Sequence, residues 1–378
     1  MKKTLIALAA LAATASFAQS TATISGNLDF ASVNVGGTQA ASKGSTITTG
    51  FGTASTSVLR FIAVEDLGGG MRATAQYNFD PRTLANDAIG NTLNGSTDVT
   101  KLANTTTGLS RDELFVGLSG GFGNIRLGSP NSIGLNAWQP SSPLGTGIGS
   151  GYTGNGVSGT MTNSFVQTRY NRSVRYDSPV MGGFQVAVLY AAGNDQPAQA
   201  ATSTAIVNGG LTAQRIPNGR QATEIGLRYA AGPLTLAYAN VAQGAQTNGT
   251  GYYTTGSGAG AAKTSANVFS ASYTMGATTL HAGMNDGNRL AQTSATNGAA
   301  LDSKGSNIGI THNIGAIGLM ASMRTQKVGA EEAKVSGFRA DYNFSKTSAA
   351  YVGYEKYENG KATANETTMA SIGLRKSF

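Results

Sequence analysis

The chain of 378 residues contains no cysteine and only 12% charged residues. Without cysteine there can be no disulfide framework, no zinc–thiolate site and no cysteine nucleophile. A soluble domain carries roughly twice this proportion of charge on its surface. After the first residues, the sequence also lacks an apolar run of about eighteen or more residues, which excludes an ordinary transmembrane helix.

The first residues have the pattern of an export signal. Two lysines precede a short apolar run, and small residues follow up to Ala18. This pattern predicts a secretory signal peptide over residues 1–18, for export by the Sec route. The remaining residues, 19–378, are then expected to form one domain.

Most of this domain consists of short segments in which apolar and polar residues alternate. In "MRATAQYNF" (71–79), "TEIGLRYA" (223–230) and "VFSASYTM" (268–275), one face is apolar and the other is polar. Such alternation predicts β-strands with two different faces. Glycine is abundant, with 52 residues, and proline is scarce, with 8. Together these features are typical of a membrane β-barrel, which has lipid outside and water inside.

Short and long connections alternate between the predicted strands. The short turns lie near residues 67–70, 119–123, 179–183, 230–233, 275–278, 313–316 and 344–348. The longer connections lie near 35–55, 81–109, 129–166, 193–219, 242–262, 287–302, 327–333 and 359–364. This pattern predicts an all-β fold, a 16-stranded antiparallel transmembrane β-barrel with short periplasmic turns and long extracellular loops. A β-solenoid or adhesin would show a fixed repeat, and none is found.

The end of the chain fits this barrel. In "TTMASIGLRKSF" the alternation continues to Phe378. We expect this last strand to pair with the first, near "TATISGNLDF", and to place Phe378 at the membrane rim.

Several stretches resemble the Gram-negative general porins, specifically the beta-proteobacterial type. They are "VLRFIAVEDLGGGMRATAQYNF", "RDELFVGLSGGFGNIRLG", "RYNRSVRYDSPVMGGFQVAVLY" and the terminal "GLRKSF". The resemblance implies a homotrimer of 16-stranded barrels, each narrowed by an inward-folded third loop that faces a ladder of arginines. It also implies that Phe378 is a signal for the barrel-assembly machinery. The chain departs from the family pattern at Ser129-Pro130 and lacks an acidic tip on the third loop.

The alternation also predicts which arginines face the lumen. The inward set is Arg60, Arg72, Arg111, Arg126, Arg169 and Arg175. Four of them, Arg60, Arg111, Arg126 and Arg175, are expected near mid-height, and Arg72 near the periplasmic mouth. Arginine suits a passage for anions because it stays charged and can bind a carboxylate or phosphate in two-pronged fashion. Alternatively, these arginines pair with acids such as Asp112 or Glu113. Arg172 falls on the wrong face for the lumen.

The third long connection, about 129–166, is expected to narrow the lumen. It contains no Asp, Glu, Lys or Arg, so it would place a neutral surface opposite a basic wall. We expect Trp138 and Tyr152 to set the width there. The alternative is an ordinary exposed loop.

No catalytic or metal-binding pattern stands out. His281 and His312 lie on different faces of their strands, which argues against a shared metal. No nucleophile elbow, zincin, P-loop or dinucleotide fingerprint occurs in a suitable context. The formal net charge of +8 is spread over strands that line a lumen, so it does not indicate nucleic-acid binding. We therefore expect no enzyme activity, no metal and no cofactor.

The sequence thus predicts a porin of the Gram-negative outer membrane, for passive diffusion of small hydrophilic solutes and ions with a preference for anions. The expected partners are two further copies of the chain, outer-membrane lipid and lipopolysaccharide, the barrel-assembly machinery, and small anionic or neutral solutes. The alternative on the same fold is a solute-specific channel for organic anions. An adhesin or a barrel enzyme would differ from both because it would give no channel conductance.

Overall fold

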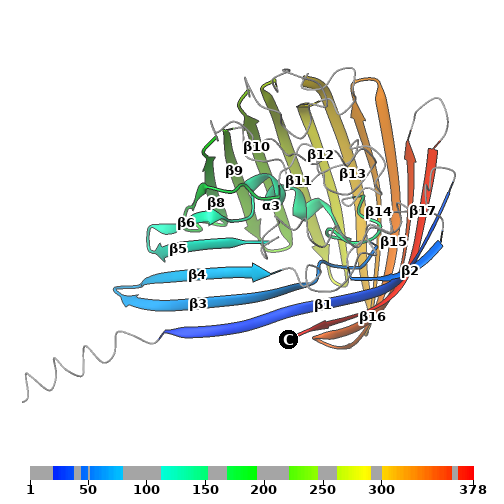
Figure 1. Cartoon of the computed structure of the whole chain (residues 1–378), viewed down its shortest axis with the longest axis horizontal. Helices are drawn as coiled ribbons and strands as arrows, with labels where there is room; N and C mark the ends of the chain where they lie inside the picture. Colours follow the sequence, from blue (N-terminus) through cyan, green and yellow to red (C-terminus); the bar gives the residue numbers. More distant parts are fainter. Residues whose placement is uncertain are drawn as a thin grey trace, which may run out of the picture.

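The computed structural model describes residues 20–37, 44–49, 52–79, 112–151, 168–193, 221–245, 262–290, 300–359 and 365–378. Its strands form one antiparallel sheet that closes on itself (Figure 1). The predicted signal peptide lies outside the described residues. No helix in the described ranges is both long and apolar enough to cross a membrane.

Seventeen strand segments make up the sheet. They are β1 (Thr21–Gly36), β2 (Gly44–Thr48), β3 (Val58–Gly68), β4 (Met71–Phe79), β5 (Leu114–Gly120), β6 (Gly123–Ser129), β7 (Ser173–Asp177), β8 (Phe184–Ala191), β9 (Ala222–Ala231), β10 (Leu234–Gln243), β11 (Thr264–Met275), β12 (Thr278–Leu290), β13 (Ala300–Ile314), β14 (Ile317–Val328), β15 (Glu331–Ser345), β16 (Ser348–Asn359) and β17 (Asn365–Ser377). A short α-helix, α3 (Ile133–Trp138), and a 3₁₀-helix, η3 (Gln139–Ser141), lie between β6 and β7.

The seventeen segments build sixteen strands of the barrel. The first part of β1 pairs with β3, ending at Asn27↔Val58. Its second part pairs with β2, starting at Ala31↔Thr48. Therefore β2 and β3 are two pieces of one strand, interrupted between Thr48 and Val58. The predicted 16-stranded barrel is confirmed, whereas the interruption was not predicted.

The barrel closes where the two ends of the chain meet. Strands β1 and β17 pair from Asn27↔Ser377 to Gly36↔Thr368. Beyond this ladder, the Phe378 N–H donates to the Gly26 carbonyl at 3.1 Å, and the Gly26 N–H donates to the Phe378 carbonyl at 2.9 Å. The Phe378 ring is 53% exposed. The last strand thus completes the sheet, as its alternation predicted.

All seven predicted short turns are present, each joining an adjacent pair of strands at one end of the barrel. One expected long connection, at 327–333, is instead a tight turn between β14 and β15, with Val328 opposite Glu331. The turn contains Gly329 at φ 57°. A two-residue hairpin needs such a left-handed conformation, which glycine adopts without strain.

The outer surface of the barrel is apolar. On β17, Ile372 and Leu374 face outward and are 63% and 64% exposed. The preceding residue, Ser371, faces inward and is 7% exposed. The same alternation runs around the sheet and leaves many large apolar side chains exposed. A surface of this kind is unfavourable in water and fits a lipid bilayer.

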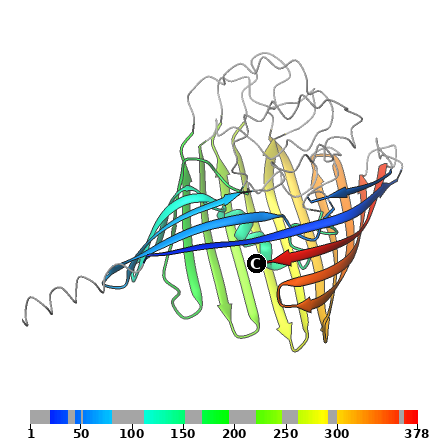
Figure 2. The ribbon, with the colours of Figure 1, turned by 60° about the horizontal axis from the view of Figure 1, so that its bottom comes forward.

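The strands differ in length around the barrel. Segments β5–β8 have 5 to 8 residues, whereas β11–β17 have 12 to 15. Figure 2 shows the long strands of the yellow-to-red half standing side by side, with α3 within the ring of strands. One side of the lumen is therefore bounded by short strands and the other side by long strands.

Candidate functional site: the lumen

The third long connection enters the lumen directly after β6. Its first turn is helical because the Ser132 hydroxyl accepts a hydrogen bond from the Leu135 N–H at 2.9 Å, which caps the N-terminus of α3. The η3 turn follows at once, with Pro140 in its first turn. We call the described part of this connection, residues 129–151, the third loop.

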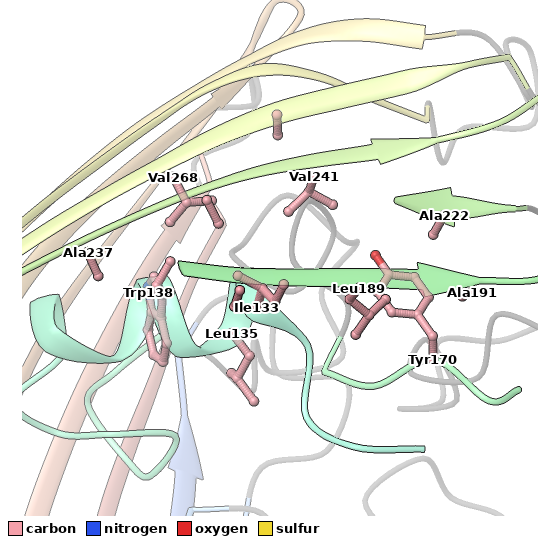
Figure 3. Close-up of a cluster of buried hydrophobic side chains, with 14 residues drawn as sticks. Ile133, Leu135, Trp138, Tyr170, Leu189, Ala191, Ala222, Ala237, Val241 and Val268 are labelled. Carbon is pink, nitrogen blue, oxygen red and sulfur yellow. The ribbon is translucent and has the colours of Figure 1, made fainter. Parts of the chain in front are cut away.

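Helix α3 packs on an apolar patch of the inner wall. Five of its six residues are buried, and four of these carry the apolar side chains of Ile133, Leu135, Ala137 and Trp138. They form one cluster with Tyr170 and with small inward side chains of the wall, as Figure 3 shows. The wall residues are Ala187, Leu189 and Ala191 on β8, Ala222 on β9, Ala237, Ala239 and Val241 on β10, and Ala266 and Val268 on β11. The helix therefore covers a stretch of wall that would be unfavourable in contact with water.

Two buried carboxylates hold the backbone of the third loop. Glu224 accepts hydrogen bonds from the Ile133 and Gly134 N–H groups at 2.6 and 3.0 Å. Glu355 accepts from the Gly149 and Gly151 N–H groups at 2.8 and 3.3 Å. Both carboxylates are 0% exposed. Since the loop has no charged residue, Glu224 and Glu355 of the wall supply the side-chain acceptors for its backbone N–H groups at both anchor points, and Glu224 does so at the N-terminus of α3.

Further polar groups of the wall bind carbonyls along the loop. His281 Nδ1 donates to the Pro140 carbonyl at 2.8 Å, and the Asn307 amide donates to the Ser141 carbonyl at 2.5 Å. The Ser322 hydroxyl donates to the Gly149 carbonyl at 3.0 Å. These contacts step from β12 to β14 and extend the anchoring between Glu224 on β9 and Glu355 on β16. The third loop thus follows the inner wall on one side of the barrel.

Two of the predicted inward arginines share one acid. Arg175 Nη2 lies 2.7 Å from Asp177 Oδ1, and Arg126 pairs with the other oxygen of Asp177. Arg175 also donates to the Asn131 carbonyl at 2.6 Å, which ties the start of the third loop to the wall. Arg126 lies 4.0 Å from Glu113 and 5.6 Å from the Phe115 ring centroid. The positive charges of Arg126 and Arg175 are therefore partly balanced by Asp177 and Glu113.

Two further arginines of the predicted inward set, Arg169 and Arg60, differ from each other. Arg169 pairs with Asp112 at 3.0 Å and donates to the Asn131 side chain at 2.9 Å. Arg60, on β3, is half-buried and has no hydrogen bond or ion pair in the part of the chain that the structure describes. Of these lumen arginines, Arg60 presents the least balanced charge.

The remaining predicted residues fall in several places. Arg72 is exposed two residues from the turn that follows β3. Arg111 and Tyr152 lie outside the described residues. Arg172 is exposed and has φ 55°, so it sits at an irregular point just before β7.

Trp138 differs from its expected role in setting the width of the lumen. Its side chain is 3% exposed, and the Arg324 guanidinium lies 5.5 Å from its ring centroid. The ring is therefore part of the packing beneath the third loop and does not face the open lumen. Arg324 itself is 4% exposed.

Two cavities remain beside the third loop. One, of about 800 Å³, is lined by Arg126, Arg175, Arg228 and Asp177, among others. The other, of about 750 Å³, is lined by Arg60, Arg169, Arg375, Lys346 and Asp112, together with many hydroxyl and amide side chains. The loop thus narrows the lumen and leaves space for water and small solutes.

Sequence reasoning missed Asp177, Glu224 and Glu355. All three lie on the inward face of their strands, so the alternation that located the arginines could also have located them. Asp177 stands two residues after Arg175, on the same face. For Glu224 and Glu355, the available signal was an acidic residue on the inward face of a strand, in a barrel whose third long connection has no charged residue.

The histidines lie apart, as their parity predicted. His281 faces the third loop, whereas His312 lies 2.8 Å from the Thr278 hydroxyl at the short-turn end. Within the described ranges, no group of three or more His, Asp or Glu side chains is arranged to hold a metal ion.

Comparison with known proteins gives a family match across most of the chain. The profile of the Gram-negative porins matches residues 4–362. Outer membrane porin protein 32 of Delftia acidovorans is 32% identical over 266 residues, which cover 66% of each chain. Major outer membrane protein P.IB of Neisseria gonorrhoeae is 34% identical over 143 residues. That match covers 36% of this chain and 32% of the Neisseria protein.

A solved structure supports the fold independently. The anion-selective porin from Comamonas acidovorans superposes with a TM-score of 0.65 at 18% sequence identity. The match covers 95% of this chain and 100% of that chain. At this identity the likeness concerns the fold alone.

Proposed function

Because this chain belongs to the Gram-negative porin family, we propose that it forms a channel for passive diffusion of small hydrophilic solutes and ions. Membership places the protein in the outer membrane. Family and fold are those of passive channels rather than enzymes. The observation that carries the proposal is the lumen itself, which is enclosed by sixteen strands and narrowed by a loop that leaves cavities of about 800 and 750 Å³.

We further propose that the channel prefers anions. The described residues that line the two cavities include seven arginines or lysines and two aspartates. Glu113 and Asp341 also lie near lining arginines, and the surplus of positive charge persists when they are counted. Such a surplus raises the local concentration of anions and lowers that of cations. The anion-selective porin from Comamonas acidovorans has the same fold.

Within this set, Arg60 and Lys346 have the clearest role. Both line the cavity of about 750 Å³, and neither has an acidic partner among the described residues. Arg126, Arg169 and Arg175 face acids at close range, so their fields are reduced. We therefore assign the main contribution to anion preference to Arg60 and Lys346, together with Arg228, which lines the other cavity and also has no acidic partner among the described residues.

The expected partners follow from the family and from the outer surface. A homotrimer accords with the family. The apolar outer face accords with contact to outer-membrane lipid and lipopolysaccharide. Phe378, exposed at the end of β17, suits recognition by the barrel-assembly machinery. These partners are proposals for this chain, as are its solutes.

A solute-specific channel for organic anions is the second candidate. It is favoured by the lining of the cavity of about 750 Å³, where Arg60 and Lys346 stand among hydroxyl groups such as those of Thr56, Thr146 and Ser348. Cations and hydroxyls together suit a carboxylate. Current block by a low concentration of one carboxylate would identify a specific channel, whereas a general porin would show none.

The main test is the reversal potential of the purified protein in a planar bilayer under a salt gradient. For an anion-preferring channel, the reversal potential lies on the side of the equilibrium potential of the anion. An absence of conductance steps would reject the porin function. Conductance with cation selectivity would reject only the anion preference.

A further inference from the structure

Residues 52–57 leave the barrel wall and enter the lumen, and we call them the inserted segment. They lie between β2 and β3, opposite the stretch of β1 between Asn27 and Ala31 that pairs with β17 but has no ladder partner on the β2–β3 side. Ser57 fills this gap, since its hydroxyl accepts from the Asp29 N–H at 2.9 Å. The Thr49 and Ser57 hydroxyls, 2.6 Å apart, close the base of the segment. Thr49 and Ser57 are 2% and 0% exposed.

One buried carboxylate organises the inserted segment. Asp29 is 0% exposed, and its Oδ2 accepts from the Ser55 N–H at 2.8 Å and from the Ser55 hydroxyl at 2.9 Å. Its Oδ1 accepts from the Tyr351 hydroxyl at 2.5 Å. That hydroxyl in turn accepts from the Ala54 N–H at 3.1 Å. Buried polar groups satisfied in this way hold one defined conformation.

The inserted segment touches the tip of the third loop directly. The Ile148 N–H donates to the Thr53 carbonyl at 2.8 Å. A side chain at Gly147 would overlap the Ala54 carbonyl oxygen, so the two backbones approach as closely as glycine allows. The same carbonyl accepts from Arg339 Nη1 at 3.0 Å. The loop tip is therefore held between Glu355 on the wall and the inserted segment.

The inserted segment also borders the open lumen. Thr53, Ser55 and Thr56 line the cavity of about 750 Å³, together with Thr146 of the third loop and Arg60 of the wall. Thr56 is exposed. The boundary of the passage is thus formed by two inward segments and not by the third loop alone.

We propose that the inserted segment is a second constriction element, which narrows the passage at Thr56 and positions the third loop through Asp29 and Tyr351. This inference rests on the proposed channel function. It assigns part of the pore width to residues 52–57 and makes Asp29 and Tyr351 positioning residues that solutes do not touch. A porin narrowed by its third loop alone would need neither.

The absence of native cysteine allows a direct test with single introduced thiols. The variants are Thr56→Cys in the inserted segment, Thr146→Cys in the third loop and Ser272→Cys, which lines the other cavity. Each is reconstituted as full-length protein in a planar bilayer and treated with a negatively charged methanethiosulfonate, and mass measurement reports the extent of labelling. We expect Thr56→Cys to lose current to the same degree as Thr146→Cys, and Ser272→Cys to lose less.

Two results would overturn the assignment of Thr56 to the passage. One is a failure of the reagent to label Thr56→Cys, and the other is a current loss no greater than that of labelled Ser272→Cys. If the unmodified protein shows no conductance at all, the proposed channel function fails instead. The two failures are therefore distinguishable.

The positioning role is tested with a matched pair of tyrosines on β16. Tyr351→Phe removes the hydroxyl that links Asp29 to Ala54, whereas Tyr354→Phe removes a hydroxyl from the lipid-facing side, where Tyr354 is 44% exposed. We expect Tyr351→Phe to show more frequent fluctuations of the open-channel current, and Tyr354→Phe to match the unmodified protein. Traces from Tyr351→Phe that equal those of the unmodified protein would overturn the role of Asp29 and Tyr351.

Discussion

The two sides of the lumen do different work. The side from β9 to β16 holds the third loop, through an apolar cluster and the buried carboxylates Glu224 and Glu355. The side from β3 to β7 carries Arg60, Arg126 and Arg175, which line the two cavities, and Arg126 and Arg175 pair with Asp177. The shape of the passage is therefore set mainly by β9–β16 together with the inserted segment, and its charge mainly by β3–β7.

This division has a physical reason. A loop without charges can be held firmly only where water is excluded, because buried hydrogen bonds are costly to break. Charged side chains that act on passing ions must instead remain accessible to water, and an exposed ion pair contributes little to the stability of the fold. Placing both tasks on one wall would weaken both. Substitutions on the two sides are expected to have separable effects.

The largest effect is expected on the side that holds the loop. Glu355→Ala leaves the Gly149 and Gly151 N–H groups without their acceptor. Each buried donor left unsatisfied costs about 1–3 kcal/mol, so the loop tip should detach from the wall more often. We expect a lower unfolding temperature and a higher, noisier single-channel conductance, with selectivity changed little.

Glu358→Ala is the matched control for this prediction. Glu358 lies three residues further along β16, on the exposed face, and pairs with Lys356 at 2.9 Å. Its removal should leave conductance and thermal stability close to those of the unmodified protein. Equal effects of the two substitutions would contradict the anchoring role of Glu355.

The next effect is expected on the charged side. Asp177→Asn removes the acid shared by Arg126 and Arg175 and leaves the third loop anchored to Glu224 and Glu355. One unit charge at about 8 Å in water is worth about 0.5 kcal/mol, roughly a twofold change in local anion concentration. We expect a stronger anion preference in the reversal potential at nearly constant conductance.

Asp66→Asn removes the same charge at a turn, where the Asp66 side chain accepts from the Gly68 N–H at 2.9 Å. It should leave the reversal potential unchanged. A shift equal to that of Asp177→Asn would mean that total charge, and not charge beside the third loop, sets the preference.

The same division explains what could be predicted from the sequence. The alternation of apolar and polar residues separates the two faces of each strand. It placed Arg60, Arg126 and Arg175 on the polar face, and in the structure these residues line the two cavities. The glycine-containing short turns indicated where the chain reverses direction between adjacent strands. Both signals are local, and a barrel of sixteen regular strands follows from them.

The rest depends on contacts between distant segments. The inserted segment reads as part of a long connection, because only pairing with β1 reveals that β2 and β3 are one strand. The burial of Trp138 depends on an apolar patch spread over β8–β11, whose small alanines resemble ordinary lumen residues. Asp177 was visible in the alternation, but its sharing by two arginines required the geometry of β6 and β7.

A further effect is expected from a single arginine. Arg60→Gln removes a cation that lines the cavity of about 750 Å³ and lacks an acidic partner among the described residues. The reversal potential should move towards cation flow, opposite in direction to the shift in Asp177→Asn, since each substitution changes the charge of the lumen by one unit. Arg72→Gln, near the short-turn end, is the matched control and should move it less. An unchanged potential in Arg60→Gln would remove Arg60 from the selectivity of the channel.

The smallest effect separates exposed from shielded charges. Raising the salt from 0.1 to 1 M shortens the Debye length from about 10 to about 3 Å, so the field of half-buried Arg60 should be screened before it reaches the middle of the passage. The pairs formed by Arg126 and Arg175 with Asp177 are more buried, with side-chain exposures of 8% to 16%, and salt should alter them less. We therefore expect the anion preference of the unmodified protein to weaken at 1 M salt and the difference between it and Arg60→Gln to shrink. Reversal potentials measured at a fixed concentration ratio and two mean concentrations test this. If the preference persists undiminished at 1 M, the selectivity arises from ion size or from contacts shorter than the Debye length, and the exposed arginine does not control it.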